Sequence, residues 1–338
     1  MARFTPFVTA VCTAAALVAA SPSLAATPAT PSGGAGAALP AARSGTVQEL
    51  SLTSSHLADP YRYTVYLPRG YESDCLSYPV VYLLHGASGN ERDWLDKGKV
   101  APTLDRLIAE ERIPPVVVVM PGHRAMWWVD GHADKAETVL LDDLLPEVEK
   151  RFRVSKEREG RVFAGLSAGG FATVRFAFTR PELFAVGLAL SPAVYQPVPP
   201  QNSSAVKDPT FQKDGAFDAE LWKRLNWPAL VEGYKAQPLR VPLYLNSGDH
   251  DRFDIVYHAA VLYQELRRIQ PGSVEYRVVD GDHEWPVWEH TIGDALGYAA
   301  KYIKGPQSAM TVAAGDTSHV PTGGSSADAT VQNGASCR

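Results

Sequence analysis

Three features are scarce in this sequence: excess charge of one sign, long apolar runs and cysteine. Lys and Arg number 32 against 37 Asp and Glu, which gives a net charge of -5 over 338 residues. This near balance provides no electrostatic basis for nucleic acid or an anionic membrane as the main partner. The sequence has no internal repeat and no glycine loop that would cradle a phosphate, so no nucleotide cofactor is expected.

The N-terminal segment has the pattern of a secretory signal peptide. Arg3 is a short positive region, residues 7–20 are apolar, and residues 23–25 (Ser-Leu-Ala) offer the small side chains that a signal peptidase reads. The apolar run is shorter than the length that a helix needs to span a bilayer, so we expect no stable membrane insertion. The sequence predicts a signal peptide over residues 1–25 and a secreted protein, extracellular or in the cell envelope. An uncleaved anchor is the alternative.

The chain has three cysteines, and Cys12 lies inside the predicted signal peptide. Cleavage would leave Cys75 and Cys337. An exported protein can keep a disulfide bond, but Cys337 is the penultimate residue of a segment with little sequence complexity. A Cys75–Cys337 bridge, two free thiols and an intermolecular link therefore all stay open.

Composition divides the rest of the chain into a folded part between two biased segments. Residues 26–45 are rich in Pro, Gly, Ala and Thr, which is typical of a flexible linker, and residues 305–338 form a low-complexity tail. Residues 46–304 between them suit one large domain. With 45% hydrophobic and 20% charged residues, the chain can bury a large core.

Short apolar runs alternate with amphipathic segments inside this domain. Strands are predicted at residues 61–67, 79–84, 115–120, 162–164, 184–190, 241–246 and 274–279, and helices at 100–112, 139–152, 253–269 and 288–303. Pro146 should mark a kink or a helix start, and residues 195–234 are predicted to be an insertion. The alternation is typical of an α/β fold with a mostly parallel central sheet and helices on both faces.

A serine in a glycine-rich turn follows the strand at 162–164. The sequence Gly-Leu-Ser-Ala-Gly at residues 165–169 fits G-x-S-x-G, and a helix-forming segment begins at once. Strand, sharp turn and helix in this order are what a nucleophile elbow requires. Small residues flank the serine because strand and helix pass closely there. We therefore predict that Ser167 is a nucleophile; an ordinary glycine-rich turn is the alternative.

A serine nucleophile needs a base, and the base needs a carboxylate that orients it. On an α/β-hydrolase sheet the three residues arrive in the order serine, acid, histidine. His283 follows the strand at 274–279 and is predicted to be the base. Asp249 and Asp251 both follow the strand at 241–246, and the pattern alone does not choose between them.

The oxyanion of the transition state needs two backbone N–H groups. Ala168, the residue after the nucleophile, is predicted to supply one. Ala87, in the His-Gly-Ala turn at residues 85–87, is predicted to supply the other. An ordinary turn at the end of a strand is the alternative for this segment.

Six motifs together carry a family resemblance. They are Tyr-Leu-Leu-His-Gly at residues 82–86, Val-Val-Met-Pro-Gly at 118–122, Leu-Leu-Pro-Glu-Val-Glu-Lys-Arg-Phe at 144–152, Gly-Leu-Ser-Ala-Gly-Gly at 165–170, Arg-Pro-Glu-Leu-Phe at 180–184 and Gly-Asp-His at 281–283. With them the chain resembles the α/β-hydrolase esterases that include feruloyl esterases, enterochelin-type esterases, S-formylglutathione hydrolase and the mycolyltransferases. The resemblance implies the α/β-hydrolase fold and an acyl-enzyme on Ser167. It favours Asp251 as the acid, because the family's G-x-x-D pattern maps to residues 248–251.

Four tryptophans lie near the predicted site. Trp127, Trp128, Trp285 and Trp288 could wall an apolar or aromatic acyl pocket. Buried core tryptophans are the alternative for each of them.

A metal site could be drawn from Asp249, His250, Asp251 and Asp254. The triad explains these residues with fewer assumptions, so neither a metal nor another cofactor is predicted. The sequence predicts a secreted serine carboxylic-ester hydrolase that acts on a small-molecule or carbohydrate-linked ester. The alternatives are an acyltransferase that uses the same acyl-enzyme and, less favoured, a non-catalytic secreted binding protein.

Overall fold

The computed structural model describes residues 44–122 and 127–308. The predicted signal peptide, almost all of the predicted linker and most of the predicted tail lie outside these ranges. Within the ranges, no helix combines the length and the apolar character that a membrane crossing needs.

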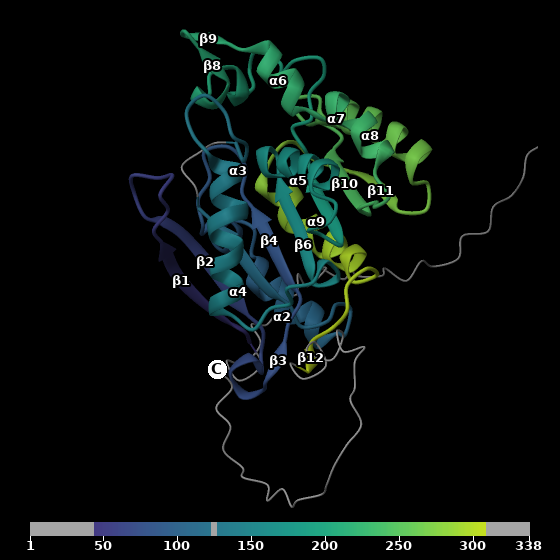
Figure 1. Cartoon of the computed structure of the whole chain (residues 1–338). Helices are drawn as coiled ribbons and strands as arrows, with labels where there is room; N and C mark the ends of the chain where they lie inside the picture. Colours follow the sequence, from purple (N-terminus) through teal and green to yellow (C-terminus); the bar gives the residue numbers. More distant parts are fainter. Residues whose placement is uncertain (1–43, 123–126, 309–338) are drawn as a thin grey trace, which may run out of the picture. The chain divides into compact units, whose positions relative to one another are not determined.

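Eight strands form the central sheet, in the order β1-β2-β5-β4-β6-β7-β10-β11 (Figure 1). They are β1 (Thr46–Leu52), β2 (Tyr61–Leu67), β4 (Val80–Leu84), β5 (Val117–Pro121), β6 (Arg161–Leu166), β7 (Val186–Leu190), β10 (Leu243–Gly248) and β11 (Val274–Val279). Strand β2 is antiparallel to its neighbours β1 and β5, and the other pairs are parallel. The predicted α/β fold with a mostly parallel sheet is confirmed.

The strands are connected by helices and by short elements. The helices are α1 (Asp93–Asp96), α2 (Val100–Ala109), α3 (Ala136–Thr138), α4 (Leu145–Arg151), α5 (Ala168–Thr179), α6 (Ala219–Leu225), α7 (Trp227–Ala236), α8 (Ile255–Ile269) and α9 (Trp285–Ala299). A π-helical segment, Val139–Leu144, leads directly into α4, whose first turn holds Pro146. Leu144 has helical φ -70° and ψ -45°, so the helical backbone predicted over residues 139–152 continues through Pro146, where it changes from π-helical to α-helical turns.

The side chains of β4 alternate between two hydrophobic cores. Val81 and Leu83 pack in one core together with α2 and α9, whereas Val80, Tyr82 and Leu84 pack in another together with α4 and α5. Successive residues of a strand point to opposite faces of a sheet. Helices therefore cover both faces, and continuous apolar strands are buried between them.

Strand β12 (Gln307–Ser308) pairs with β3 (Leu76–Ser77), so regular pairing continues past residue 304, the predicted end of the domain. Cys75, directly before β3, is disulfide-bonded. The alternative of two free thiols is therefore wrong. Cys12 and Cys337 both lie outside the described residues, so a Cys75–Cys337 bridge stays one of the open alternatives.

The predicted insertion at residues 195–234 holds α6, α7 and the hairpin of β8 (Gln212–Lys213) and β9 (Ala216–Phe217), drawn at the top of Figure 1. Its residues 201–204 line the same cleft as Ser167 and His283, which follow β6 and β11. The insertion therefore lies by the carboxyl ends of the strands. Its attachment includes the N–H of His132, which donates to the carbonyl oxygen of Thr210 at 2.9 Å.

A carboxylate beside this attachment is destabilised by its surroundings. Burial raises the pKa of Asp134 to about 6, and the charges of Asp208 and Asp130 add to the rise, although the N–H of Ala136 donates to the carboxylate. Asp208 is 2% exposed, and its Oδ2 has no hydrogen-bond partner among the described residues. The folded state therefore disfavours the ionised form of Asp134.

We expect Asp134→Asn to stabilise the protein at neutral pH but not in acid. The pKa of this group rises from an ordinary 3.8 to about 6 on folding. Ionisation of Asp134 therefore does not lower the free energy of unfolding at a pH below the lower pKa. The loss grows as the pH rises between the two pKa values and is constant above the higher one. With a discount for partial exposure, the gain at neutral pH should be on the order of 1 kcal/mol, or about 2–4 °C in Tm.

Thermal unfolding of both proteins across this pH range measures the effect. Asp142→Asn, at an exposed aspartate of the π-helical segment, is the matched control. A gain in Tm that did not change with pH would contradict the electrostatic explanation.

Candidate active site

Ser167 lies in a strained turn between β6 and α5. Its backbone has φ 54° and ψ -113°, a region that residues with side chains rarely adopt. The N–H of Ser167 donates to the carbonyl oxygen of Leu190 in β7 at 2.9 Å. A Cβ added to Gly165 would lie 2.6 Å from the carbonyl carbon of Gly169, so the strand and the helix require glycine at this crossing.

The hydroxyl of Ser167 belongs to a hydrogen-bonded relay. His283 Nε2 lies 2.9 Å from Ser167 Oγ, and His283 Nδ1 lies 2.8 Å from Asp251 Oδ2. The Asp251 side chain is fully buried, that of His283 is 8% exposed, and Asp251 Oδ1 accepts the N–H of Phe253 at 3.0 Å. The structure therefore brings the predicted serine, histidine and Asp251 together.

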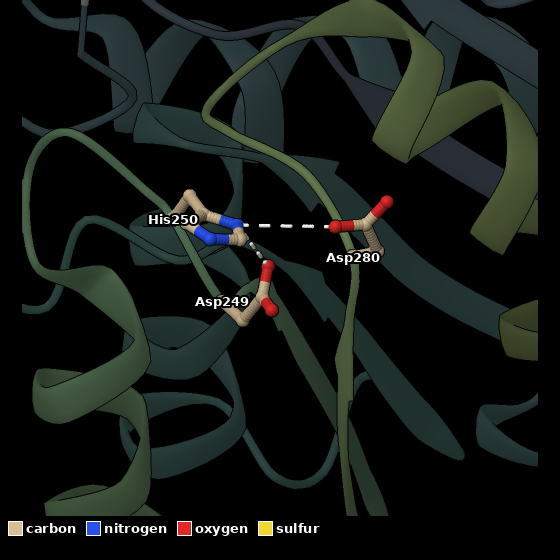
Figure 2. A group of neighbouring side chains, drawn as sticks. All are labelled: Asp249, His250 and Asp280. Atoms are coloured by element: carbon tan, nitrogen blue, oxygen red, sulfur yellow. Dashed lines mark ion pairs between the residues drawn. The ribbon is translucent and has the colours of Figure 1, made fainter.

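Asp249, the other predicted candidate for the acid, points elsewhere. Its Oδ1 lies 2.7 Å from His250 Nδ1 (Figure 2) and accepts the N–H of Gly281 at 3.0 Å. That N–H and the neighbouring His250 lower the pKa of the Asp249 carboxyl. The structure thus places Asp251, and not Asp249, against His283.

The group in Figure 2 has residue types that bind divalent metals. Asp249, His250 and Asp280 could each offer one ligand atom, all within 4.8 Å of one another. The side chains are 44%, 71% and 100% exposed, respectively, so water solvates them in the absence of any ion. Asp251, which the sequence-based metal alternative also used, contacts His283 instead.

Asp282 ties together the two loops that carry the relay. Its Oδ1 accepts the N–H groups of Arg252 at 2.7 Å and of His283 at 2.6 Å, and its Oδ2 lies 2.7 Å from the Arg252 guanidinium. The hydrogen bond from the Arg252 guanidinium, together with the two backbone N–H groups, lowers the pKa of Asp282 to about 2. The acid loop and the base loop are thereby joined next to the relay.

The His283 ring lies against two aromatic rings. Phe253 and Trp288 stand perpendicular to it, with ring centroids 4.9 and 5.0 Å away. The indole N–H of Trp288 donates to Ser191 Oγ at 3.0 Å, and the N–H of Ser191 donates to Asn246 Oδ1 at 2.9 Å. Ser191 and Asn246 are fully buried. This network fixes Trp288, and sequence reasoning missed it because its members share no motif.

The predicted oxyanion donors lie on both sides of the serine. Ala168 is the first residue of α5, and Ala87 follows Gly86 in the loop after β4. Neither N–H donates to any other described residue. A Cβ added to Gly86 would lie 3.2 Å from the Cβ of Ser167, so glycine lets this loop approach the serine.

A cleft of about 670 Å³ opens over Ser167 and His283. Trp127, Trp285 and Trp288 line it, as the sequence predicts. The predicted pocket needs one correction: Trp128 does not line the cleft. Trp128 is fully buried, and its indole N–H donates to the carbonyl oxygen of His85 at 3.0 Å, so that it supports the loop that carries Ala87.

The sheet order, the strained serine turn at the end of β6 and the histidine after β11 define the chain as an α/β-hydrolase. The model of the Esterase family, described as "Putative esterase", matches residues 54–299. The chain belongs to this family, and the predicted family resemblance is confirmed.

A relative found by sequence supports this assignment. The endo-1,4-beta-xylanase/feruloyl esterase of Xylanibacter ruminicola is 34% identical over 218 residues, which are 62% of this chain and 29% of that protein. Less than a third of that relative's length is therefore matched.

Solved structures show the same likeness. A ferulic acid esterase superposes with a TM-score of 0.66 at 25% identity, covering 78% of this chain and 100% of the other. Fluorophosphonate-binding serine hydrolase F of Staphylococcus aureus, at 20% identity and a TM-score of 0.63, covers 76% of this chain and 99% of its own and shares the fold.

Proposed function

We propose that this protein hydrolyses carboxylic esters through an acyl-enzyme on Ser167. The observation that carries the proposal is the relay in which His283 contacts both Ser167 Oγ and Asp251 Oδ2, at 2.9 and 2.8 Å. A histidine between a hydroxyl and a buried carboxylate is the arrangement that activates a serine. Family membership supports the same activity.

In the first half of the reaction, Ser167 Oγ attacks the ester carbonyl carbon while His283 Nε2 takes its proton. The N–H groups of Ala87 and Ala168 donate to the resulting oxyanion. The intermediate collapses, the carbon–oxygen bond to the alcohol breaks, and His283 returns the proton to the leaving oxygen.

In the second half, water attacks the acyl-serine. His283 takes a proton from the water, the bond to Ser167 Oγ breaks, and the serine regains its proton. Asp251 holds the imidazole in one tautomer and stabilises its cation in both halves. Transfer of the acyl group to another alcohol, predicted as the alternative, would differ only in the acceptor.

An aromatic acyl group suits the cleft best. Trp127, Ala193 and Tyr195 line one part of it and are each at most 2% exposed. They form an apolar wall against which an aromatic ring would be buried. The feruloyl and ferulic acid esterases among the relatives are named for an acid of this kind.

Export from the cytoplasm is part of the proposal and depends on the sequence of residues 1–25. The disulfide bond of Cys75 is consistent with it, because disulfides persist in oxidising compartments.

Stopped-flow hydrolysis of p-nitrophenyl esters tests the proposal. We expect a burst of p-nitrophenol that matches the enzyme concentration, and a stoichiometric adduct on Ser167 after treatment with an organophosphonate. An added sugar acceptor that captured the acyl group in preference to water would favour the transferase. Absence of both turnover and labelling would reject a catalytic role.

A further inference from the structure

The turn that follows β7 lies between the strands that lead to the nucleophile and to the acid. In the sheet order, β7 stands between β6, which leads into Ser167, and β10, which leads into the loop with Asp251. The last residue of β7, Leu190, pairs with Leu166 on one side and with Asn246 on the other. Helix α9, which begins just after the base, packs against β7 and β10. This turn is therefore next to all three segments that carry the relay.

Ser191 begins the turn in a backbone conformation that serine rarely adopts. Its φ is 39°, in the left-handed region that favours glycine. Pro192 follows it, and a residue before proline ordinarily has an extended backbone. Ser191 is also fully buried. Strained residues persist where the surrounding structure holds them, and they are frequent at functional sites. Serine in place of glycine therefore indicates that the hydroxyl has a role here.

The same turn holds the backbone of the nucleophile from two sides. The N–H of Ser167 donates to the carbonyl oxygen of Leu190 at 2.9 Å, and the N–H of Ala193 donates to the carbonyl oxygen of Ser167 at 3.0 Å. A Cβ added to Gly170, in the first turn of α5, would lie 2.8 Å from the Cα of Pro192. The turn therefore packs directly against the nucleophile elbow.

The side chain of Ser191 contacts the helix that follows the base. Its Oγ accepts the indole N–H of Trp288 at 3.0 Å. Trp288 is 5% exposed and stands perpendicular to the His283 ring, with centroids 5.0 Å apart. Phe253 contacts the same imidazole at 4.9 Å. Because two aromatic rings confine the imidazole, a shift of the Trp288 indole would give His283 room to turn.

Asn246 connects this contact to the strand of the acid. Its Oδ1 and its carbonyl oxygen both accept the N–H of Ser191, at 2.9 and 3.1 Å. Its amide donates to Thr291 Oγ1 at 2.7 Å, and that hydroxyl donates to the carbonyl oxygen of Val287 at 2.7 Å. Asn246 and Thr291 are at most 1% exposed. A buried polar network whose members all have partners favours one rigid arrangement.

We infer that Ser191 is a positioning residue that aligns the nucleophile with its base. The inference rests on the proposed esterase activity and adds to it the residue that joins the two groups. The turn holds Ser167 through its backbone, and the Ser191 hydroxyl holds His283 through Trp288. The distance from Ser167 Oγ to His283 Nε2 is 2.9 Å, and small displacements of reacting groups lower rates steeply. Ser191 does not line the cleft, so its loss should affect kcat and not substrate binding.

Ser191→Gly is the main test, because it removes the hydroxyl, keeps the N–H that Asn246 accepts and relieves the backbone strain. In hydrolysis of a p-nitrophenyl ester by the full-length protein, kcat should fall about tenfold or more while KM stays within about twofold of wild type. Ser191→Ala should lose as much kcat but have a lower Tm than Ser191→Gly, since alanine keeps the strain. Equal losses at different stabilities separate positioning from a merely structural role.

Trp288→Phe tests the route from Ser191 to the base. Phenylalanine keeps a ring against His283 but has no N–H for Ser191 Oγ to accept. We expect kcat to fall in Trp288→Phe, and Ser191→Gly added to it should lower kcat by less than about twofold more. Ser54→Ala is the matched control, because Ser54 is 4% exposed, its Oγ donates to Asp143 Oδ2 at 2.6 Å, and it lies outside the cleft. This control should lower Tm and leave kcat unchanged.

An unchanged kcat in Ser191→Gly, or losses that add fully in the double variant, would overturn the positioning role while esterase activity stands. If neither Ser191 variant folds, as judged by circular dichroism, an unchanged kcat in Trp288→Phe would overturn it. If the wild type hydrolyses no ester, the proposed function fails. The NMR resonance of the His283 Nδ1 proton, assigned by its absence in His283→Gln, then decides the inference. It should broaden in Ser191→Gly but not in Ser54→Ala, and an unchanged resonance in Ser191→Gly would overturn the inference.

Discussion

Replacing Ser167 with alanine is expected to lower the rate of ester hydrolysis by about 10⁴- to 10⁶-fold while the protein stays folded. Alanine lacks Oγ, the atom that forms the covalent bond to the acyl group in the proposed reaction. His283 Nε2, which lies 2.9 Å from this oxygen, then has no other hydroxyl in the relay to activate. The residual rate should reflect water attack beside the oxyanion donors. Steady-state hydrolysis of a p-nitrophenyl ester and labelling by an organophosphonate both measure the loss.

Glycine at the same position separates the chemistry from the backbone strain. Ser167 holds φ 54° and ψ -113°, a conformation that costs a residue with a side chain about 1–3 kcal/mol. Glycine avoids this cost but adds about 0.5–1 kcal/mol of chain entropy to the unfolded state. Ser167→Gly should therefore lose activity as Ser167→Ala does. Its free energy of unfolding should nevertheless be higher than that of Ser167→Ala by on the order of 1 kcal/mol. A loss of less than about a hundredfold in either variant would contradict a nucleophilic role.

Most strands of the central sheet are predictable because they are buried on both faces. All five residues of β4 (Val80–Leu84) are apolar and nearly inaccessible, as are those of β7 (Val186–Leu190). Such runs stand out against the amphipathic helices between them. Strand β1 (Thr46–Leu52) is mostly exposed, and its pairing with β2 gives it its structure. An edge strand of this kind leaves little apolar pattern in the sequence.

The site divides in the same way between local and distant information. The turn around Ser167 and the loop that carries His283 are recognisable because each requires small residues within a few positions of the functional one. The contact between Trp288 and Ser191 joins residues 97 positions apart. Trp128, next in sequence to a cleft residue, points to the carbonyl oxygen of His85 instead. Composition does not reveal which of two adjacent tryptophans faces the cleft, since this depends on how the loop backbone turns.

The choice of acid is tested by a matched pair of variants, Asp251→Asn and Asp249→Asn. Asp251→Asn should lower kcat about 10⁴-fold, because an amide can neither hold the reactive tautomer of His283 nor stabilise its cation. Asparagine has nearly the same volume as aspartate, and its side-chain oxygen can still accept the N–H of Phe253. The Tm of Asp251→Asn should therefore stay close to that of the wild type.

Asp249→Asn keeps an acceptor for the N–H of Gly281 and loses only the exposed contact with His250, so kcat should stay within about threefold of wild type. Rates measured at saturating p-nitrophenyl ester separate the two results. A large loss in Asp249→Asn with near-normal activity in Asp251→Asn would mean that the two loops rearrange around substrate. In that case the tie between Asp282 and Arg252, at 2.7 Å, would be the contact that has to break.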